Sequence, residues 1–248
     1  MVGRREALRT ELLASVREAA RDQLRAVGPA DLSLRAIARD VGISPAGLYR
    51  YYDGRDALLT MLITDGYTDL ADHLFLAQGL AEEVSDLGRT RQVPEAADAD
   101  APPLDRLRAT WRTYRTWSLA HPNEFHLLFG QPIEGYAAPL DGATTRANAR
   151  MARALVLPAY VAWQSGDLDV PDLADPPHGL HRLAEAISEE APVPVSASFA
   201  ARTLAWWSVL HGAVALELNG QFRWLDEDAT GDLFAATLEA TLDAARPD

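Results

Sequence analysis

Hydrophobic positions recur along most of this chain at the spacing of amphipathic helices, and no segment shows the alternation typical of a strand. Short stretches rich in glycine, proline and acidic residues separate the apolar segments. The helices predicted in this way cover about residues 4–27, 34–41, 45–51, 55–84, 104–120, 123–129, 143–164, 180–190, 196–218 and 226–245. Residues 86–103 are polar, acidic and contain proline, which predicts a loose loop. The pattern therefore predicts an all-α protein.

The segment from Ser33 to Leu59 predicts two short helices joined by a tight turn. Ser33 is a suitable N-cap for the first helix, and Gly42 can end it in a left-handed conformation. Ser44 can cap the second helix, with Pro45 at its first position, where the missing N–H costs nothing. Such a pair matches the helix-turn-helix, which places its second helix in the major groove of DNA. The alternative is an αα corner inside any helical bundle.

The start of the second helix carries side chains suited to DNA. Small residues there allow close approach to base edges, and the helix N-terminus favours phosphate. Tyr49 and Arg50 have long polar tips that can contact bases or the backbone. Near the N-terminus, Arg4, Arg5 and Arg9 form a basic arm that can reach a minor groove. The alternative for this arm is a frayed, solvated terminus.

This segment resembles the N-terminal domain of TetR-family transcriptional regulators, strongly so from Arg5 to about Asp72. The matching positions are Gly42, Leu48, Tyr49, Tyr52, Arg55, Ala57, Leu58 and Leu59. The resemblance implies a DNA-binding regulator, most often a repressor, that responds to a small ligand, with Arg55 in place of a phosphate-binding lysine. Pro45 departs from the family's frequent polar residue and cannot donate a backbone N–H, and Asp53 replaces a frequent proline. The expected DNA contacts are Arg4, Arg5, Arg35, Ser44, Pro45, Ala46, Tyr49, Arg50 and Arg55.

Two segments of the C-terminal half, HPNEFHLLFG at 121–130 and WWSVLHG at 206–212, resemble the WHG-type ligand-binding domain of a subset of TetR-family proteins. Trp207, His211 and Gly212 match its motif. We therefore expect a DNA-binding domain over residues 1–54 and a ligand-binding and dimerisation domain over residues 55–248, joined by the long helix that starts near Arg55.

The C-terminal half is rich in large rings that bear polar atoms. Such rings on neighbouring helices suit an apolar pocket, with one imidazole as its polar end. The alternative is a packed core with a hydrogen-bonded histidine, and with Gly212 where two helices pack closely. The residues expected to line a pocket are Tyr114, Trp117, Phe125, Trp163, Trp207 and His211.

The helix at 196–218 is apolar on two faces, so both faces must be buried. Burial within one monomer is possible, but helix-turn-helix proteins usually read two half-sites with two copies, which favours a homodimer. In the family the last two helices of each subunit form this interface. The expected interface residues are Trp206, Val209, Ala213, Leu216, Phe234 and Leu238.

The charge distribution agrees with DNA binding through the N-terminal segment alone. The 248-residue chain has a net charge of −13, yet residues 1–60 hold ten arginines against eight acids. The acidic remainder should repel DNA and leave only the N-terminal segment able to approach it. The chain has no cysteine, no apolar run long enough to span a membrane and no signal-peptide core at its start, so we expect a cytoplasmic protein.

Enzyme and metal signatures are weak. No phosphate-binding glycine loop, dinucleotide fingerprint or nucleophile elbow is present. His178 with His181, and His121 with His126, lie close in sequence, but prolines interrupt both segments and no cysteine supports a site. We therefore predict no cofactor, no metal and no catalytic residue, with a palindromic double-stranded DNA operator and a small apolar or aromatic effector as partners. The alternative is a small-molecule-binding or enzymatic helical protein with a vestigial helix-turn-helix.

Overall fold

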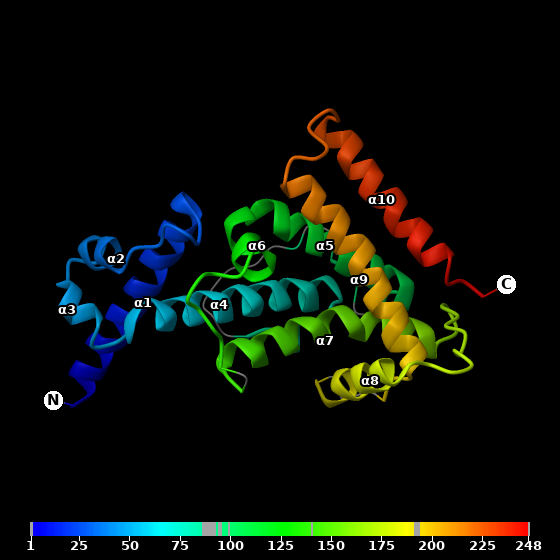
Figure 1. The fold of residues 1–248 in the computed structure, drawn as a ribbon, viewed down its shortest axis with the longest axis horizontal. Coiled ribbons are helices and arrows are strands. Elements are labelled where there is room, and N and C mark those ends of the chain that lie inside the picture. Colours follow the sequence, from blue (N-terminus) through cyan, green and yellow to red (C-terminus); the bar gives the residue numbers. More distant parts are fainter. Residues whose placement is uncertain are drawn as a thin grey trace. The chain divides into compact units, whose positions relative to one another are not determined.

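This computed structural model describes residues 2–85, 93, 96–98, 100–139, 141–190 and 194–247, with only the backbone at residues 2, 3, 5 and 190. In these residues every regular element is a helix and no strand is present, as the sequence predicts (Figure 1). The elements are α1 (Val2–Val27), α2 (Leu34–Asp40), α3 (Pro45–Leu48), α4 (Gly54–Ala77), the 3-10 helix η1 (Ala81–Glu83), α5 (Pro103–Ala120), α6 (Pro122–Phe129), α7 (Ala143–Gln164), α8 (His178–Glu190), α9 (Ala197–Leu218) and α10 (Glu227–Asp243). Much of the loop expected at 86–103 lies outside the described residues.

The predicted start and stop signals of the helix-turn-helix are confirmed. The hydroxyl of Ser33 accepts a hydrogen bond from the N–H of Ala36, and that of Ser44 accepts one from Gly47. The hydroxyl of Ser33 thus satisfies an N–H that has no partner within its helix, whereas the N–H of Gly47 donates to both the hydroxyl and the carbonyl of Ser44. Gly42 has a φ of +76°, in the left-handed region that other residues avoid, and it ends α2.

Three predicted boundaries are wrong. The helix α3 ends at Leu48, and residues 49–51 continue as a turn rather than as helix. The helix α4 stops at Ala77 instead of reaching residue 84, because Gly79 adopts a left-handed φ of +75° and turns the chain. The helix α6 begins at Pro122 rather than at Asn123, with His121 as its N-cap residue.

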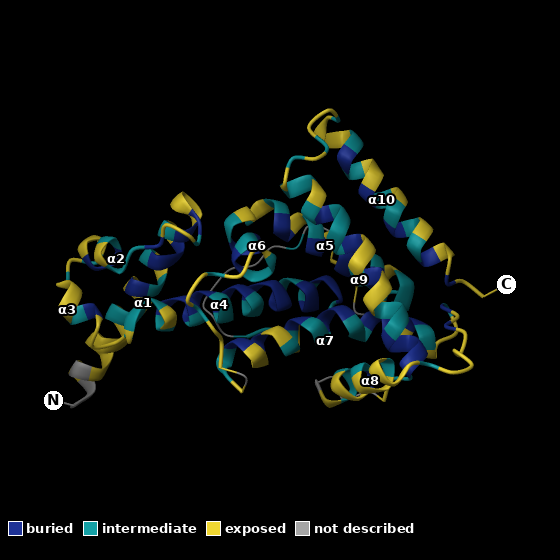
Figure 2. Ribbon diagram, viewed as in Figure 1, coloured by how far each residue is buried: buried dark blue, intermediate teal, exposed yellow. Residues whose placement is uncertain are grey.

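The chain forms two compact units, and α4 contributes to both. Unit 1 comprises residues 1–67 and 121–148. Its core joins α1–α3 to the start of α4 through fully buried side chains such as Val16, Leu24, Ile37 and Leu48, and it also includes Leu127 of α6. Buried positions follow α4 along almost its whole length (Figure 2). The predicted functional boundary at residue 54 remains a prediction.

Unit 2 comprises residues 68–120 and 149–248. Its buried side chains come from the second half of α4 and from α5, α7, α9 and α10, with Tyr114, Phe199 and Leu210 at 1% exposure or less. Pro158 lies inside α7 and has no N–H to offer to the carbonyl of Ala154. The amide of Gln78 donates to that carbonyl at 2.7 Å and replaces the missing backbone hydrogen bond. No described helix is long and apolar enough to cross a membrane.

Candidate nucleic-acid interface and aromatic cluster

The helices α2 and α3 present a polar surface above a buried anchor. Leu48 is 1% exposed and fixes α3 on the unit 1 core, while Tyr49 immediately after it is 52% exposed. The other exposed side chains of this surface that were predicted to contact DNA are Arg35, Ser44, Pro45, Ala46 and Arg50. All six of these predicted contacts are therefore exposed, and their role in binding DNA stays a prediction.

Two of the predicted contacts also have partners within the chain. The hydroxyl of Ser44 accepts the capping hydrogen bond of α3, which limits what it can offer to a phosphate. Arg55 donates through Nη2 to the carbonyls of Pro29 and Ala30, at 3.1 and 3.2 Å. Its guanidinium therefore braces the turn between α1 and α2 in addition to any contact with DNA.

The predicted basic arm is helical in the described residues. The helix α1 begins at Val2, and Arg4 and Arg9 are exposed on it. The side chain of Arg5 lies outside the described residues. A helical start carries these arginines at fixed positions, whereas an extended arm would have to become ordered on DNA.

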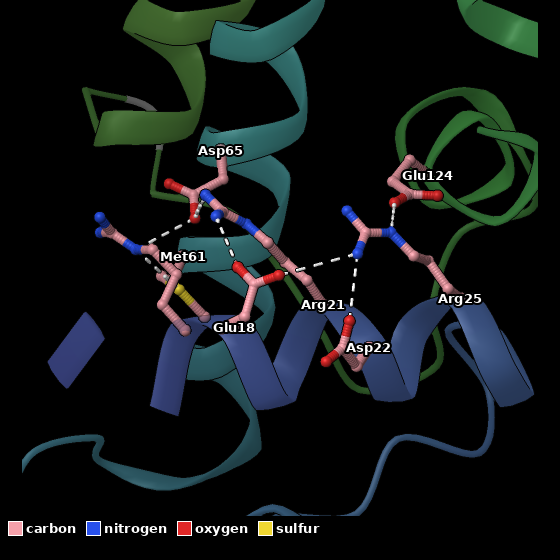
Figure 3. Close-up of polar contacts among 8 residues, drawn as sticks. Glu18, Arg21, Asp22, Arg25, Met61, Asp65 and Glu124 are labelled. Atoms are coloured by element: carbon pink, nitrogen blue, oxygen red, sulfur yellow. Dashed lines mark hydrogen bonds and ion pairs between the residues drawn. The ribbon is translucent and has the colours of Figure 1, made fainter. Parts of the chain in front are cut away.

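An ion-pair network fixes α1 to two other helices of unit 1 (Figure 3). Nη2 of Arg21 lies 2.7 Å from Oδ2 of Asp65 on α4, and Nε of Arg17 lies 3.1 Å from the same oxygen. Further along α1, Nε of Arg25 lies 3.2 Å from Oε1 of Glu124 on α6. This network was not predicted from the sequence. The signal that the sequence offered was the spacing of Asp65, Asp69 and Asp72, which places three acids on one face of an apolar helix.

The same acidic face of α4 continues in unit 2. Asp69 is 4% exposed and accepts a hydrogen bond from Nε1 of Trp117 at 2.9 Å. Asp72 is fully buried and pairs with Nη2 of Arg150 at 2.5 Å. Burial of a carboxylate is costly unless it is paired, so both contacts are needed where they occur.

Three of the rings expected at a ligand pocket form one cluster in unit 2, together with Trp111. The hydroxyl of Tyr114 lies 2.7 Å from Nδ1 of His211, and the ring of Trp207 stacks on that imidazole at 4.6 Å. Trp111 packs against both Tyr114 and Trp207, with centroids 5.5 and 6.1 Å apart. Burial lowers the pKa of His211, so the imidazole favours its neutral form near neutral pH.

The remaining predicted pocket residues lie elsewhere. Trp117 is 3% exposed, and Asp69 occupies its N–H. Trp163 stacks on Phe199 at 4.9 Å. Phe125 belongs to unit 1, where it packs on Phe129 at 5.2 Å. The shared pocket therefore stays a prediction, carried now by Tyr114, Trp207 and His211.

The predicted dimer interface stays a prediction, but two of its residues have little surface to offer. Trp206 and Leu238 are at most 5% exposed because they pack inside unit 2, whereas Phe234, at 4% exposure, lines the groove between α9 and α10. The other side of α9 is open, with Val209 49% and Leu216 47% exposed. The helices α9 and α10 are joined by a short loop and run in nearly opposite directions (Figure 1).

A mainly apolar groove of about 330 Å³ lies between α9 and α10. Val209, Ala213 and Leu216 line it from α9, and Leu233 lines it from α10. Gly212 also lines it, and a Cβ at this glycine would meet nothing within 4 Å. The alternative account, in which two helices pack closely at Gly212, is not met within this chain, because the space beside the glycine is open.

Histidines and acids do not gather into a metal site in the part of the chain that the structure describes: no group of three or more is placed to hold an ion. Within that part, neither His178 with His181 nor His121 with His126 belongs to such a group.

Comparisons with known proteins find relatives for both halves of this chain. Residues 16–62 match the family described as bacterial regulatory proteins, tetR family, and residues 107–241 match the tetracyclin repressor-like C-terminal domain. The HTH-type transcriptional regulator Rv1816 of Mycobacterium tuberculosis is 33% identical over 224 residues, which cover 89% of this chain and 86% of that protein.

Solved structures extend the likeness to the fold. The crystal structure of the regulatory protein SCO4313 is 32% identical and superposes with a TM-score of 0.69, over 96% of this chain and 98% of that one. The TetR-family regulator PfmR of Thermus thermophilus, at 15% identity and a TM-score of 0.52, covers 92% of this chain and 97% of its own, and it shares the fold alone. This chain belongs to the TetR family of DNA-binding, helix-turn-helix transcriptional regulators.

Proposed function

We propose that this regulator binds a palindromic operator as a homodimer, represses transcription there, and leaves the DNA when a small apolar or aromatic effector binds in unit 2. The observation that carries the DNA-binding part is the exposed surface of α2 and α3. It combines Tyr49, Arg35 and Arg50 in the basic segment of a chain whose remainder is strongly acidic. Such a charge distribution orients the approach to DNA. The proposed site of action on cellular DNA implies a cytoplasmic location.

Selection from random duplexes tests the operator. Purified protein is mixed with the duplexes, bound DNA is sequenced over successive rounds, and we expect an inverted repeat to be enriched, since two copies read two half-sites. Tyr49→Ala and Arg50→Ala should each weaken binding of the enriched duplex by about 1–3 kcal/mol. Arg182→Ala, at an exposed arginine of α8 in unit 2, is the control and should bind as the parent does. Parental affinity in both test variants would remove these residues from the interface.

The open side of α9 supports the homodimer. Val209 and Leu216 expose apolar surface beside the groove, and the space at Gly212 leaves room for close approach of a second helix. Exposed apolar surface of this kind is typical of protein interfaces. We propose that the same face of a second copy covers it, with Leu233 of α10 at its edge.

The cluster of Tyr114, Trp207 and His211 supports an effector site. Its imidazole exchanges a hydrogen bond with the hydroxyl of Tyr114 and stacks on Trp207, so it brings a polar group into an otherwise mainly apolar set of rings, as a binding site for a small apolar molecule requires. Effector binding would favour a conformation of the dimer with the wrong spacing of its two heads, a population shift set by the difference in affinity.

Tryptophan fluorescence tests the effector site. A panel of uncharged aromatic compounds is titrated into the protein, and a compound that quenches fluorescence should also release the enriched duplex, since linkage is reciprocal. His211→Ala should weaken the compound more than it weakens DNA. Unchanged affinity for the compound, or loss of the cooperative thermal transition, would make His211 a core histidine. A reporter gene placed behind the operator then distinguishes repression from activation.

A further inference from the structure

The helix α6 belongs to unit 1, which carries the helix-turn-helix and is called the DNA-binding head from here on, although α6 lies about 70 residues after the helix-turn-helix in sequence. Leu127 of α6 is 7% exposed and shares one hydrophobic cluster with Val16, Ala20 and Leu24 of α1. Ile133 and Tyr136, in the loop after α6, pack against the same cluster. The core of the head is therefore closed by side chains from beyond its own segment.

The first turn of α6 also makes a reciprocal polar contact with the end of α1. The carbonyl of Arg25 would ordinarily accept from the N–H four residues later, but that residue is Pro29, which has none. The side-chain amide of Asn123 donates to this carbonyl at 2.8 Å. The guanidinium of Arg25 in turn donates through Nε to Glu124, which is 9% exposed. We call these two contacts the α6 clamp.

The clamp has a counterpart in contacts of Arg25 that stay within α1. Nη1 of the same guanidinium lies 3.1 Å from Asp22, whose side chain is 66% exposed, and 3.9 Å from Glu18 (Figure 3). The contact with Glu124 joins two helices, whereas the contact with Asp22 joins one turn of a helix to the next. Glu124 and Asp22 therefore provide a matched pair for experiment, because both contact Arg25 but only Glu124 lies on another helix.

We propose that the α6 clamp positions the head for operator binding, and that Asn123 and Glu124 are positioning residues that set operator affinity without touching DNA. The helix α1 carries the core on which α2 and α3 rest, so holding its C-terminal end fixes the direction in which α3 is presented. A dimer that reads two half-sites needs both heads in register at once. A head that is held in place before binding loses less conformational freedom on binding.

The covalent path from unit 2 leads directly into this clamp. A single residue, His121, separates the end of α5 from the start of α6. Since α5 carries Tyr114 and Trp117, a change in α5 reaches Asn123 and Glu124 within a few residues of chain. This extension, from positioning to transmission of the effector signal, rests on the proposed function.

The experiment compares Glu124→Gln with Asp22→Asn in the full-length protein. The probes are the duplex enriched by selection and a scrambled duplex of the same length. We expect Glu124→Gln to weaken binding of the enriched duplex about three- to tenfold, as for the loss of one coupled contact, and to leave the scrambled duplex unaffected. Asp22→Asn should bind both duplexes as the parent does. Arg25→Gln should weaken the enriched duplex as Glu124→Gln does, and the double variant should lose no more than either single variant.

Parental affinity of Glu124→Gln for the enriched duplex would overturn the proposal, as would equal losses for both duplexes or equal effects of Glu124→Gln and Asp22→Asn. Thermal unfolding separates positioning from simple stability, because a merely structural contact lowers the midpoint and leaves the affinity of the folded protein unchanged. Amide hydrogen exchange gives a readout that needs no DNA: Asn123→Ala should speed exchange at residues 25–28, and unchanged exchange would contradict the clamp. If no aromatic compound releases the parent from its operator, the effector part of the proposed function fails, while these results still decide the positioning role.

Discussion

Asp65 and Glu18 contact the same arginine from very different surroundings, and the structure predicts very different consequences of neutralising each. Asp65 is 6% exposed and its Oδ2 accepts from Arg21 at 2.7 Å and lies 3.1 Å from Arg17. Glu18 lies 3.5 Å from Arg21, but its side chain is 59% exposed. Asp65→Asn and Glu18→Gln each remove one charge and preserve the shape of the side chain.

The expected loss in the free energy of unfolding depends on which charged groups are left without a partner after each substitution. Removing one partner of a buried ion pair costs about 3–5 kcal/mol, because it leaves a buried charge without compensation. Two features reduce this for Asp65→Asn: Arg21 keeps its contact with Glu18, and the side chain of Arg17 is 42% exposed and can be hydrated. We therefore expect a loss of about 2–3 kcal/mol in the free energy of unfolding. Glu18→Gln should cost about 0.5 kcal/mol or less, as exposed pairs do.

Urea unfolding followed by circular dichroism, at one fixed protein concentration, measures both losses. The double variant Arg21→Met with Asp65→Leu should recover most of the stability that Asp65→Asn loses, because it removes both buried charges and leaves only Arg17, whose side chain is 42% exposed and can be hydrated. Equal losses in the two single variants, or a loss below about 1 kcal/mol for Asp65→Asn, would refute the view that burial decides the energetics of this network.

Three further expectations concern the interface, the dimer and pH. Arg55→Ala should reduce the salt dependence of operator binding by about one unit of slope if Arg55 contacts one phosphate; a parental slope with reduced thermal stability would restrict Arg55 to its role in the turn after α1. Val209→Glu combined with Ala213→Glu should yield monomers in sedimentation, because unpaired charges would be buried at the proposed interface; an intact folded dimer would place the interface elsewhere. Because burial lowers the pKa of His211 from its ordinary 6.5, the free energy of unfolding should be highest above about pH 6.5 and should decrease as the pH falls below that value. His211→Gln should remove this part of the pH dependence, and an unchanged profile would assign it to other groups.

Local chemistry explains which parts of the fold the sequence could predict. Ser33, Gly42 and Ser44 act through hydrogen bonds or backbone angles within four residues of themselves, so their roles could be derived without tertiary information. The exposure of Tyr49 and the burial of Leu48 followed from the same short segment. The predicted end of α4 was wrong because two local signals disagreed. The apolar pattern continued beyond Gly79, but the left-handed turn at this glycine ended the helix.

Partners that are distant in sequence explain the rest. Asp65 is paired by cations 44 and 48 residues earlier, and Glu124 by Arg25, 99 residues earlier, and no periodicity reveals such pairs. The helix α9 shows the same difficulty, because it is apolar on two faces. Which face packs inside depends on α5 and α10, and the structure buries Trp206 while it exposes Val209.

The charge count of the N-terminal segment also changes meaning once its arginines are placed. Residues 1–60 hold ten arginines, but Arg17, Arg21 and Arg25 face acids inside unit 1. Among the described side chains, Arg35 and Arg50 are exposed, and no acidic partner is seen for either. The cations free to displace counterions from DNA are therefore fewer than the sequence total, and they are concentrated beside α3 and at the start of α1. Because affinity for phosphate depends on those contacts rather than on net charge, an acidic protein can bind DNA through one small surface while the rest of its charge keeps that surface correctly oriented.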